Sequence, residues 1–243
     1  MGGFPRMLSY QYDAGSRRTR ITHPEGGYLT YEYNAASRLA VVRETGAAVL
    51  ATLSYDSFGR RIGTSFNGAS STFGYNTASR LSSLAHNPAG SSADQTLGFG
   101  YNPASQIATR SATNDAYVSN SAYAVDRSYA VNGLNQYTQA GPASFTYDAN
   151  GNLISDGSSN IVYDAENRLV SASGARTAGL VYDPLGRLFE LSGGPWGAYH
   201  FLHDGDALVG EYNCCNSLMS RYVHAGNTAA DIPLIWYEVN IGG

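Results

Sequence analysis

Apolar and polar residues alternate along most of this chain in short runs, and each run ends at a polar cluster. The apolar residues at the ends of these runs stand two places apart, as in Tyr31 and Tyr33 or Phe73 and Tyr75. Side chains of a β-strand point to opposite faces in turn, so this spacing predicts strands with one apolar face. The clusters between runs are rich in Asp, Asn, Ser and Gly, which favour tight turns. The pattern therefore predicts a succession of β-hairpins.

The hairpins form a repeat of about 21 residues. Its anchor tyrosines, taken as position 0, are Tyr12, Tyr33, Tyr55, Tyr75, Tyr101, Tyr129, Tyr147, Tyr163 and Tyr182. Position +1 is Asp or Asn in eight copies: Asp13, Asn34, Asp56, Asn76, Asn102, Asp148, Asp164 and Asp183. Position +4 is Ser, Gly or Asn in the same eight: Ser16, Ser37, Gly59, Ser79, Ser105, Gly151, Asn167 and Gly186. Position +5 is Arg in six: Arg17, Arg38, Arg60, Arg80, Arg168 and Arg187.

Each position of the repeat has a physical role. The apolar residue at −2 and the tyrosine at 0 share one face of a strand. The Asp or Asn at +1 can accept hydrogen bonds from N–H groups two residues on and so close a turn. Glycine at +4 supplies the positive φ that such a turn needs, and Arg at +5 starts the return strand. The copy at Tyr129 lacks this pattern, which predicts an irregular or longer turn there.

The expected fold is therefore all-β, with antiparallel hairpins stacked in one curved spiral sheet. We interpret residues 1–243 as a single array, with repeats over about 8–198 and divergent C-terminal repeats over about 199–238. A looser stretch over about 87–135 is the expected place for an insertion or a kink.

Composition excludes several function classes. Only 14% of residues are charged and the net charge is −4, so the basic stripe typical of nucleic-acid binding is not expected. No apolar run has the ~18–20 residues of a membrane span, and the N-terminus lacks the apolar stretch of a signal peptide.

The chain has two cysteines, Cys214 and Cys215, and they are adjacent. Neighbouring cysteines cannot close the loops of a disulfide framework. Two reduced thiols in a turn are the expected arrangement, with a strained vicinal disulfide or an intermolecular bridge as alternatives.

Segments 147–153 (YDANGNL), 163–169 (YDAENRL) and 182–188 (YDPLGRL) resemble the YD repeats of the Rhs family. The resemblance extends from about residue 10 to about residue 238 and rests on nine copies. It implies a hollow β-shell, which encloses a toxic C-terminal polypeptide in bacterial toxins and belongs to cell-surface adhesion receptors in animal relatives. By this resemblance the partners would be the remainder of an Rhs core or its passenger polypeptide, and the location extracellular or at the cell surface.

The chain also departs from the family pattern. The family's terminal block, with aspartates that catalyse self-cleavage, is not found before the sequence ends at VNIGG, and four turns carry Ser where the family favours Gly. We therefore expect a fragment of a larger Rhs core or a short protein derived from one, and a self-processing peptidase is disfavoured.

No catalytic, cofactor or metal site is expected. His200 and His203 stand three residues apart, but on a strand they would point to opposite faces, and the sequence Asp204-Gly205-Asp206 is typical of a turn rather than a calcium loop. The aspartates at +1 recur at every turn in a structural register, which an active site does not require. There is no G-x-S-x-G elbow and no phosphate-binding loop.

The first hypothesis is thus a non-enzymatic scaffold, a wall segment of an Rhs-type shell around a passenger polypeptide. The structural repeat residues that carry it are Tyr12, Asp13, Tyr33, Tyr55, Asp56, Gly59, Tyr75, Tyr101, Tyr147, Asp148, Gly151, Tyr163, Asp164, Tyr182, Asp183 and Gly186. The alternatives are a surface module that binds glycan through its tyrosines, or a β-repeat polymer that self-associates through open sheet edges.

Overall fold

The computed structural model describes residues 6–88, 90–117, 126–194, 197–225 and 233–238. Contacts divide the chain into two units. Residues 1–120 form most of the first unit and residues 121–223 most of the second, so the division falls within the stretch expected to be loose. The two units are described separately below.

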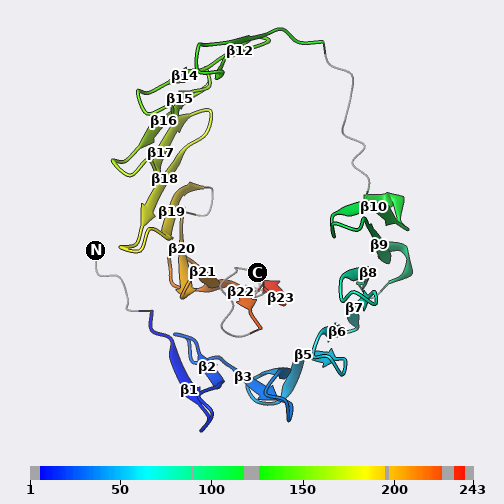
Figure 1. Cartoon of the computed structure of the whole chain (residues 1–243). Coiled ribbons are helices and arrows are strands. Elements are labelled where there is room, and N and C mark those ends of the chain that lie inside the picture. Colours follow the sequence, from blue (N-terminus) through cyan, green and yellow to red (C-terminus); the bar gives the residue numbers. More distant parts are fainter. Residues whose placement is uncertain (1–5, 89, 118–125, 195–196, 226–232, 239–243) are drawn as a thin grey trace. The chain divides into compact units, whose positions relative to one another are not determined.

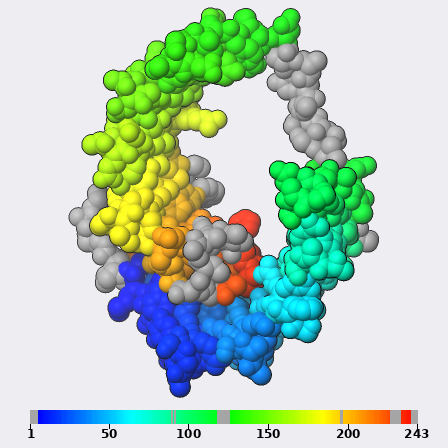
Figure 2. Space-filling view, in the orientation of Figure 1, coloured from blue at the N-terminus to red at the C-terminus, as the bar shows by residue number. Residues whose placement is uncertain are grey.

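The first unit holds one ten-stranded sheet in which the strands follow one another in chain order (Figure 1). Its strands are β1 (Ser9–Tyr12), β2 (Arg18–Thr22), β3 (Tyr28–Tyr33), β4 (Leu39–Glu44), β5 (Ala48–Tyr55), β6 (Arg61–Phe66), β7 (Ala69–Tyr75), β8 (Leu81–Asn87), β9 (Gln95–Tyr101) and β10 (Ile107–Ala112). Two short 3-10 turns, η1 (Ser91–Ala93) and η2 (Asp115–Tyr117), accompany it. Every pairing in the sheet is antiparallel, and the colours of Figure 2 pass in sequence order along this unit, from blue to green.

The second unit begins with a three-stranded sheet and continues in a ten-stranded one. The smaller sheet contains β11 (Tyr129–Val131), β12 (Tyr137–Ala140) and β13 (Ala143–Ser144). The larger contains β14 (Thr146–Tyr147), β15 (Leu153–Ser155), β16 (Ser159–Tyr163), β17 (Leu169–Gly174), β18 (Ala178–Tyr182), β19 (Leu188–Gly194), β20 (Gly197–Asp204), β21 (Ala207–Asn213), β22 (Leu218–Val223) and β23 (Ile235–Glu238). All three sheets are open and run in chain order. The predicted all-β class, built of antiparallel hairpins, is confirmed.

The core is a row of cross-strand neighbours on one sheet face. In the first unit Tyr31 lies opposite Val42, which lies opposite Ala51, and all three are buried. The pair Ile21 and Leu29, on β2 and β3, extends this row. Such apolar cross-strand contacts are the unit of sheet stabilisation, each contributing roughly 0.2–1 kcal/mol.

Eight of the nine anchor tyrosines are the last residue of a strand, and the turn that follows leads into an antiparallel partner. The exception is Tyr129, which begins β11 instead of ending it. The return strands begin at position +6, one residue later than Arg at +5 suggests.

The prediction of an irregular or longer turn after Tyr129 is wrong. The turn between β11 and β12 has the same hydrogen bonds as the others, with Val131 at position 0, Asn132 at +1 and Asn135 at +4. Tyr129 therefore occupies position −2, where it contacts Tyr137 with ring centroids 5.2 Å apart. The apparent irregularity arises because valine replaces tyrosine as the anchor.

Every YD-type hairpin carries a bulge at the same place. Tyr12 pairs with Arg18 but Gln11 pairs with Arg20, so Thr19 at position +7 is the extra residue. The same register shift is found in ten hairpins: β1–β2, β3–β4, β5–β6, β7–β8, β9–β10, β11–β12, β14–β15, β16–β17, β18–β19 and β21–β22. A bulge bends its strand and increases the local twist. Repetition of one bulge per hairpin therefore gives the sheets a built-in curvature, visible in the first unit in Figure 1.

Candidate functional site

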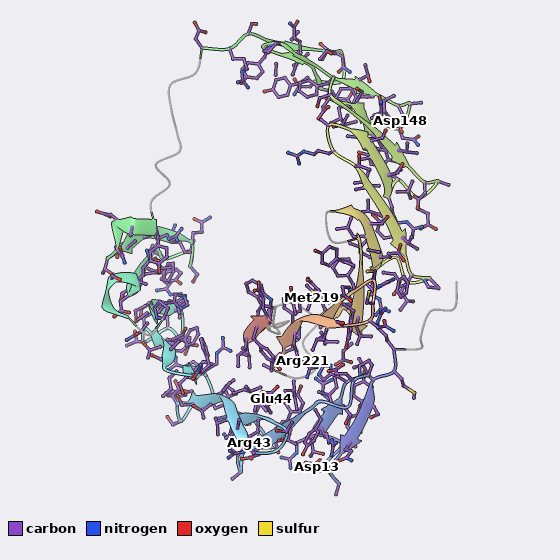
Figure 3. All side chains as sticks on the ribbon, turned by 180° about the vertical axis from the view of Figure 1, so that it is seen from behind. Asp13, Arg43, Glu44, Asp148, Met219 and Arg221 are labelled. Atoms are coloured by element: carbon purple, nitrogen blue, oxygen red, sulfur yellow. The ribbon has the colours of Figure 1, made fainter. Side chains whose placement is uncertain are left out.

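The turns are closed by the residue at +1. In the first turn the N–H of Asp13 donates to the carbonyl of Arg17, and the N–H of Ser16 donates to the carbonyl of Asp13, each at a distance of 3.0 Å. The Asp13 carboxylate accepts from the N–H groups of Gly15 and Arg17, at 2.9 and 3.0 Å. Asp13 and Asp148, labelled in Figure 3, show this position in the first and the second unit.

The residue at +4 has a left-handed backbone in every such turn. The φ angle is 59° at Ser16, Ser37 and Ser79, 63° at Ser105, 61° at Asn167, and 84°, 88° and 81° at Gly59, Gly151 and Gly186. This is the type I turn followed by a left-handed residue that commonly joins hairpin strands. The four serines hold a conformation that glycine or asparagine adopts at lower cost.

The carboxylates at +1 are held in their charged form. The side-chain amide of Asn152, followed by its backbone N–H, lowers the pKa of Asp148. The backbone N–H of Arg168 is the largest influence on Asp164, whose pKa is also lowered. The oxygens of these carboxylates accept hydrogen bonds from N–H groups of the same loop.

The arginine at +5 connects one hairpin to the next. Arg60 bonds its own +1 residue, with Nε and Nη2 each 2.7 Å from the Asp56 carboxylate. Its Nη1 donates a 3.0 Å hydrogen bond to the hydroxyl of Ser79, the +4 residue of the following hairpin. The guanidinium also lies over the ring of Tyr75, the anchor of that hairpin, at 4.5 Å from the centroid. One side chain thus touches positions +1, +4 and 0 of two consecutive hairpins.

The same arrangement recurs along both units. Arginine at +5 lies over the next anchor ring in Arg17–Tyr33 (4.9 Å), Arg38–Tyr55 (5.6 Å), Arg80–Tyr101 (4.7 Å) and Arg168–Tyr182 (4.9 Å). Where +5 is an amide residue the link persists, since Gln136 donates to the carbonyl of Gly151 at 3.1 Å and Asn152 to the side chain of Asn167 at 2.9 Å. Where +4 is Gly59, a Cβ atom would overlap the guanidinium of Arg38.

The anchor hydroxyl makes a second link, to the preceding hairpin. The Tyr55 hydroxyl donates a 2.8 Å hydrogen bond to the carbonyl of Leu39, which is the +6 residue of the preceding hairpin. Leu39 lies on β4 and Tyr55 on β5, and the pairing of these two strands ends at Val41. The Tyr55 hydroxyl therefore bonds a backbone carbonyl that lies beyond the last β4–β5 pair. Equivalent bonds join Tyr33 to Arg18, Tyr75 to Arg61, Tyr101 to Leu81, Tyr147 to Tyr137 and Tyr182 to Leu169, at 2.7–2.9 Å. Burial raises the pKa of Tyr33 and of Tyr55, which keeps these hydroxyls protonated as donors.

We call these links between consecutive hairpins the inter-hairpin ladder: the anchor hydroxyl, the +5 side chain and the +4 residue that it touches. Six of the eight predicted anchor tyrosines that end a strand take part in it through their hydroxyls. The hydroxyls of Tyr12 and Tyr163 make no hydrogen bond within the described part of the chain. For Tyr12 no earlier hairpin is described that would offer a carbonyl.

Sequence reasoning missed a tenth copy of the repeat. In the β21–β22 hairpin Tyr212 is position 0, Asn213 is +1 and Asn216, with φ of 64°, is +4. Asn213 accepts hydrogen bonds from the N–H groups of Cys215 and Ser217, both at 2.9 Å. The sequence YNCCNSL carries the signal, because Asn at +1 and +4 and Leu at +6 match the pattern once serine is allowed at +5.

The histidines considered as ligands have other surroundings. His200 lies on β20, where its Nε2 is 3.2 Å from a carboxylate oxygen of Glu190 and its ring meets Phe189 edge-on. Gly205 and Asp206 form the turn between β20 and β21. Among the described residues no group of three or more His, Cys, Asp or Glu side chains is placed to hold a metal ion. No helix in the described part of the chain is long and apolar enough to cross a membrane.

Comparison with known proteins gives matches among solved structures alone. No family model matches the chain, and neither does any curated protein. It is similar to a crystal structure of TcdB2-TccC3-TEV, with 16% identity over 90% of this chain and a TM-score of 0.42. It is also similar to a mutant Tc holotoxin pore of Photorhabdus luminescens, with 17% identity over 86% of this chain and a TM-score of 0.41. The chain covers 14% and 13% of those two chains.

Proposed function

We propose that this chain is a non-catalytic wall segment of an Rhs-type β-shell that encloses or presents a passenger polypeptide. The observation that carries the proposal is the inter-hairpin ladder, because the same links recur between hairpins of both units. In such an array each hairpin is stabilised by its neighbours, and the sheet can be extended by adding copies.

The use of the polar residues supports a scaffold over an enzyme. Asp56 and Arg60 form an ion pair with each other, and the third guanidinium nitrogen of Arg60 donates a hydrogen bond to Ser79. A catalytic group must instead point at a site where a substrate can sit, with its pKa shifted toward its task. The +1 aspartates are shifted away from proton transfer at neutral pH, since their pKa values are lowered.

Each joint of the ladder contributes modestly and the array gains by repetition. The hydrogen bond from an anchor hydroxyl is worth about 1 kcal/mol, and the arginine over the ring roughly 0.5–1 kcal/mol. The Asp–Arg pairs, which are half-buried at the turns, add a further modest contribution. A wall built this way resists local opening along its whole length, which suits a container.

The partners in this proposal are the remainder of an Rhs core and its passenger polypeptide, and the location is extracellular or at the cell surface. Both follow from the resemblance of the YD repeats. Glycan binding through the tyrosines is less favoured, because five anchor rings are already covered by an arginine and six anchor hydroxyls are already bonded.

The proposal is tested by fusing an unfolded reporter peptide to the C-terminus of the full chain and following its digestion by a nonspecific protease. We expect the reporter to be cleaved several-fold more slowly than the same peptide fused to an unrelated folded domain. Equal rates would contradict the shell proposal. A glycan array screened with the same protein separates the alternative, since a specific hit would favour the adhesion module.

A further inference from the structure

The two cysteines stand at the tip of a repeat turn. Cys214 and Cys215 occupy +2 and +3 of the β21–β22 hairpin, where both thiols are free and exposed. Their Sγ atoms lie 3.5 Å apart. Two sulfur ligands are therefore presented to solvent on one side of a short, ordered turn.

The turn that presents the thiols is fixed by the repeat geometry. The N–H of Asn213 donates to the carbonyl of Ser217 at 3.0 Å, and that of Asn216 donates to the carbonyl of Asn213 at 3.1 Å. The side chain of Asn213 bonds two further N–H groups of the same loop. In the other turns +2 and +3 hold residues as varied as Ala35 and Ala36 or Pro184 and Leu185. The fold thus requires no particular side chain at these positions.

The sulfur separation selects the kind of centre that fits. Two metal–sulfur bonds of about 2.3 Å at a tetrahedral angle place the sulfurs about 3.8 Å apart, and a right angle brings them to about 3.3 Å. A linear two-coordinate ion would need about 4.6 Å. The observed 3.5 Å matches a bent, chelated centre. Zinc needs four ligands, and no cluster of three or more suitable side chains is found in the described regions.

We propose that the tip of the β21–β22 hairpin is a bidentate dithiol site for a thiophilic centre that brings its own third ligand, of the class of trivalent organoarsenicals. With phenylarsine oxide the two S–H bonds and the As–O bond are exchanged for two As–S bonds, and one water is released. Arsenic stays trivalent and no oxidant is consumed. The site is independent of the proposed shell function.

The test uses the full chain with phenylarsine oxide in excess glutathione, followed by intact mass spectrometry. We expect one phenylarsenic adduct per chain that glutathione does not remove and ethanedithiol does. Cys214→Ser and Cys215→Ser should each weaken retention by about 10²-fold or more, because the chelate is lost. Circular dichroism checks that both variants stay folded.

A relocated pair provides the matched control. In the Cys214→Ser/Cys215→Ser background, Ala35→Cys with Ala36→Cys places two thiols at +2 and +3 of the β3–β4 turn, which has the same hydrogen bonds. Retention of the adduct should return. If glutathione strips the wild type as readily as the single variants, or if the relocated pair does not bind, the proposal is overturned.

Discussion

The hydroxyl of Tyr55 donates a 2.8 Å hydrogen bond to the carbonyl of Leu39. This bond joins two consecutive hairpins beyond Val41, where the pairing of their strands ends. Tyr55→Phe removes this bond and little else. We expect the free energy of unfolding to fall by about 1 kcal/mol, measured by urea denaturation.

Tyr163→Phe is the control for that measurement. Tyr163 is also an anchor at the end of a strand, but its hydroxyl bonds no described residue. The change should therefore leave the free energy of unfolding within about 0.5 kcal/mol of wild type. Equal losses in the two variants would mean that the inter-hairpin bond contributes nothing.

Serine at +4 sets two opposing effects against each other. The backbone at Ser16 and at Ser79 has a φ of 59°, which glycine adopts at up to ~1 kcal/mol lower cost. The Ser79 hydroxyl accepts a bond from Arg60, whereas no earlier hairpin is described that would reach Ser16. We expect Ser16→Gly to raise the melting temperature and Ser79→Gly to raise it less. A larger rise for Ser79→Gly would show that the hydrogen bond from Arg60 does not stabilise the fold. A fall of the melting temperature in both variants would contradict the left-handed backbone at position +4.

Acid should weaken the fold through the turn carboxylates. The amide and N–H of Asn152 lower the pKa of Asp148 in the folded state, while the unfolded value is about 3.9. A depressed pKa contributes stability that is complete above about pH 5 and is lost as the pH falls through the folded value. We therefore expect a declining urea midpoint below about pH 5, and a shallower decline in Asp148→Asn. Asparagine already serves at this position in Asn102 and Asn132, so the variant should fold.

The edge strand β23 predicts self-association. It ends the order of its sheet, and Trp236 on it is 57% exposed although its ring stacks on Tyr222. An unprotected apolar edge can pair with another chain. Light scattering over a concentration series should show dimers or larger species, which Trp236→Lys reduces. Phe58→Lys, at an exposed turn tip, should have no such effect, and a monomeric wild type at high micromolar concentration would contradict the prediction.

The sequence predicts the hairpin and its turn because both are local. The Asp or Asn at +1 and the left-handed residue at +4 act within five residues, so their pattern is visible without neighbours. Tyrosine is an imperfect marker of position 0, because Val131 takes its place in the β11–β12 hairpin, and the polar residues at +1 and +4 are the better guide. The copy at Tyr212 keeps the tyrosine but has Ser217 at +5, so it lacks the arginine that marks most of the other copies.

The inter-hairpin ladder could not be predicted in the same way. The bond from Arg60 to Ser79 spans 19 residues and depends on which hairpins are neighbours. The bulge at +7 has no sequence marker, because Thr19, Ala40 and Ile62 share no property beyond their place. A structure is needed to show that the +5 arginine bonds the aspartate of its own hairpin and also reaches the next hairpin.

The central claim is that the ladder couples consecutive hairpins, and a double-mutant cycle on Arg60 and Tyr75 tests it most directly. The cycle compares Arg60→Gln, Tyr75→Leu and the double variant by urea denaturation, with Arg60 and Tyr101 as a pair from hairpins that are not consecutive. The account predicts a coupling energy of roughly 0.5–1 kcal/mol for Arg60 and Tyr75 and none for the control pair. A coupling energy of zero in the first cycle would contradict it.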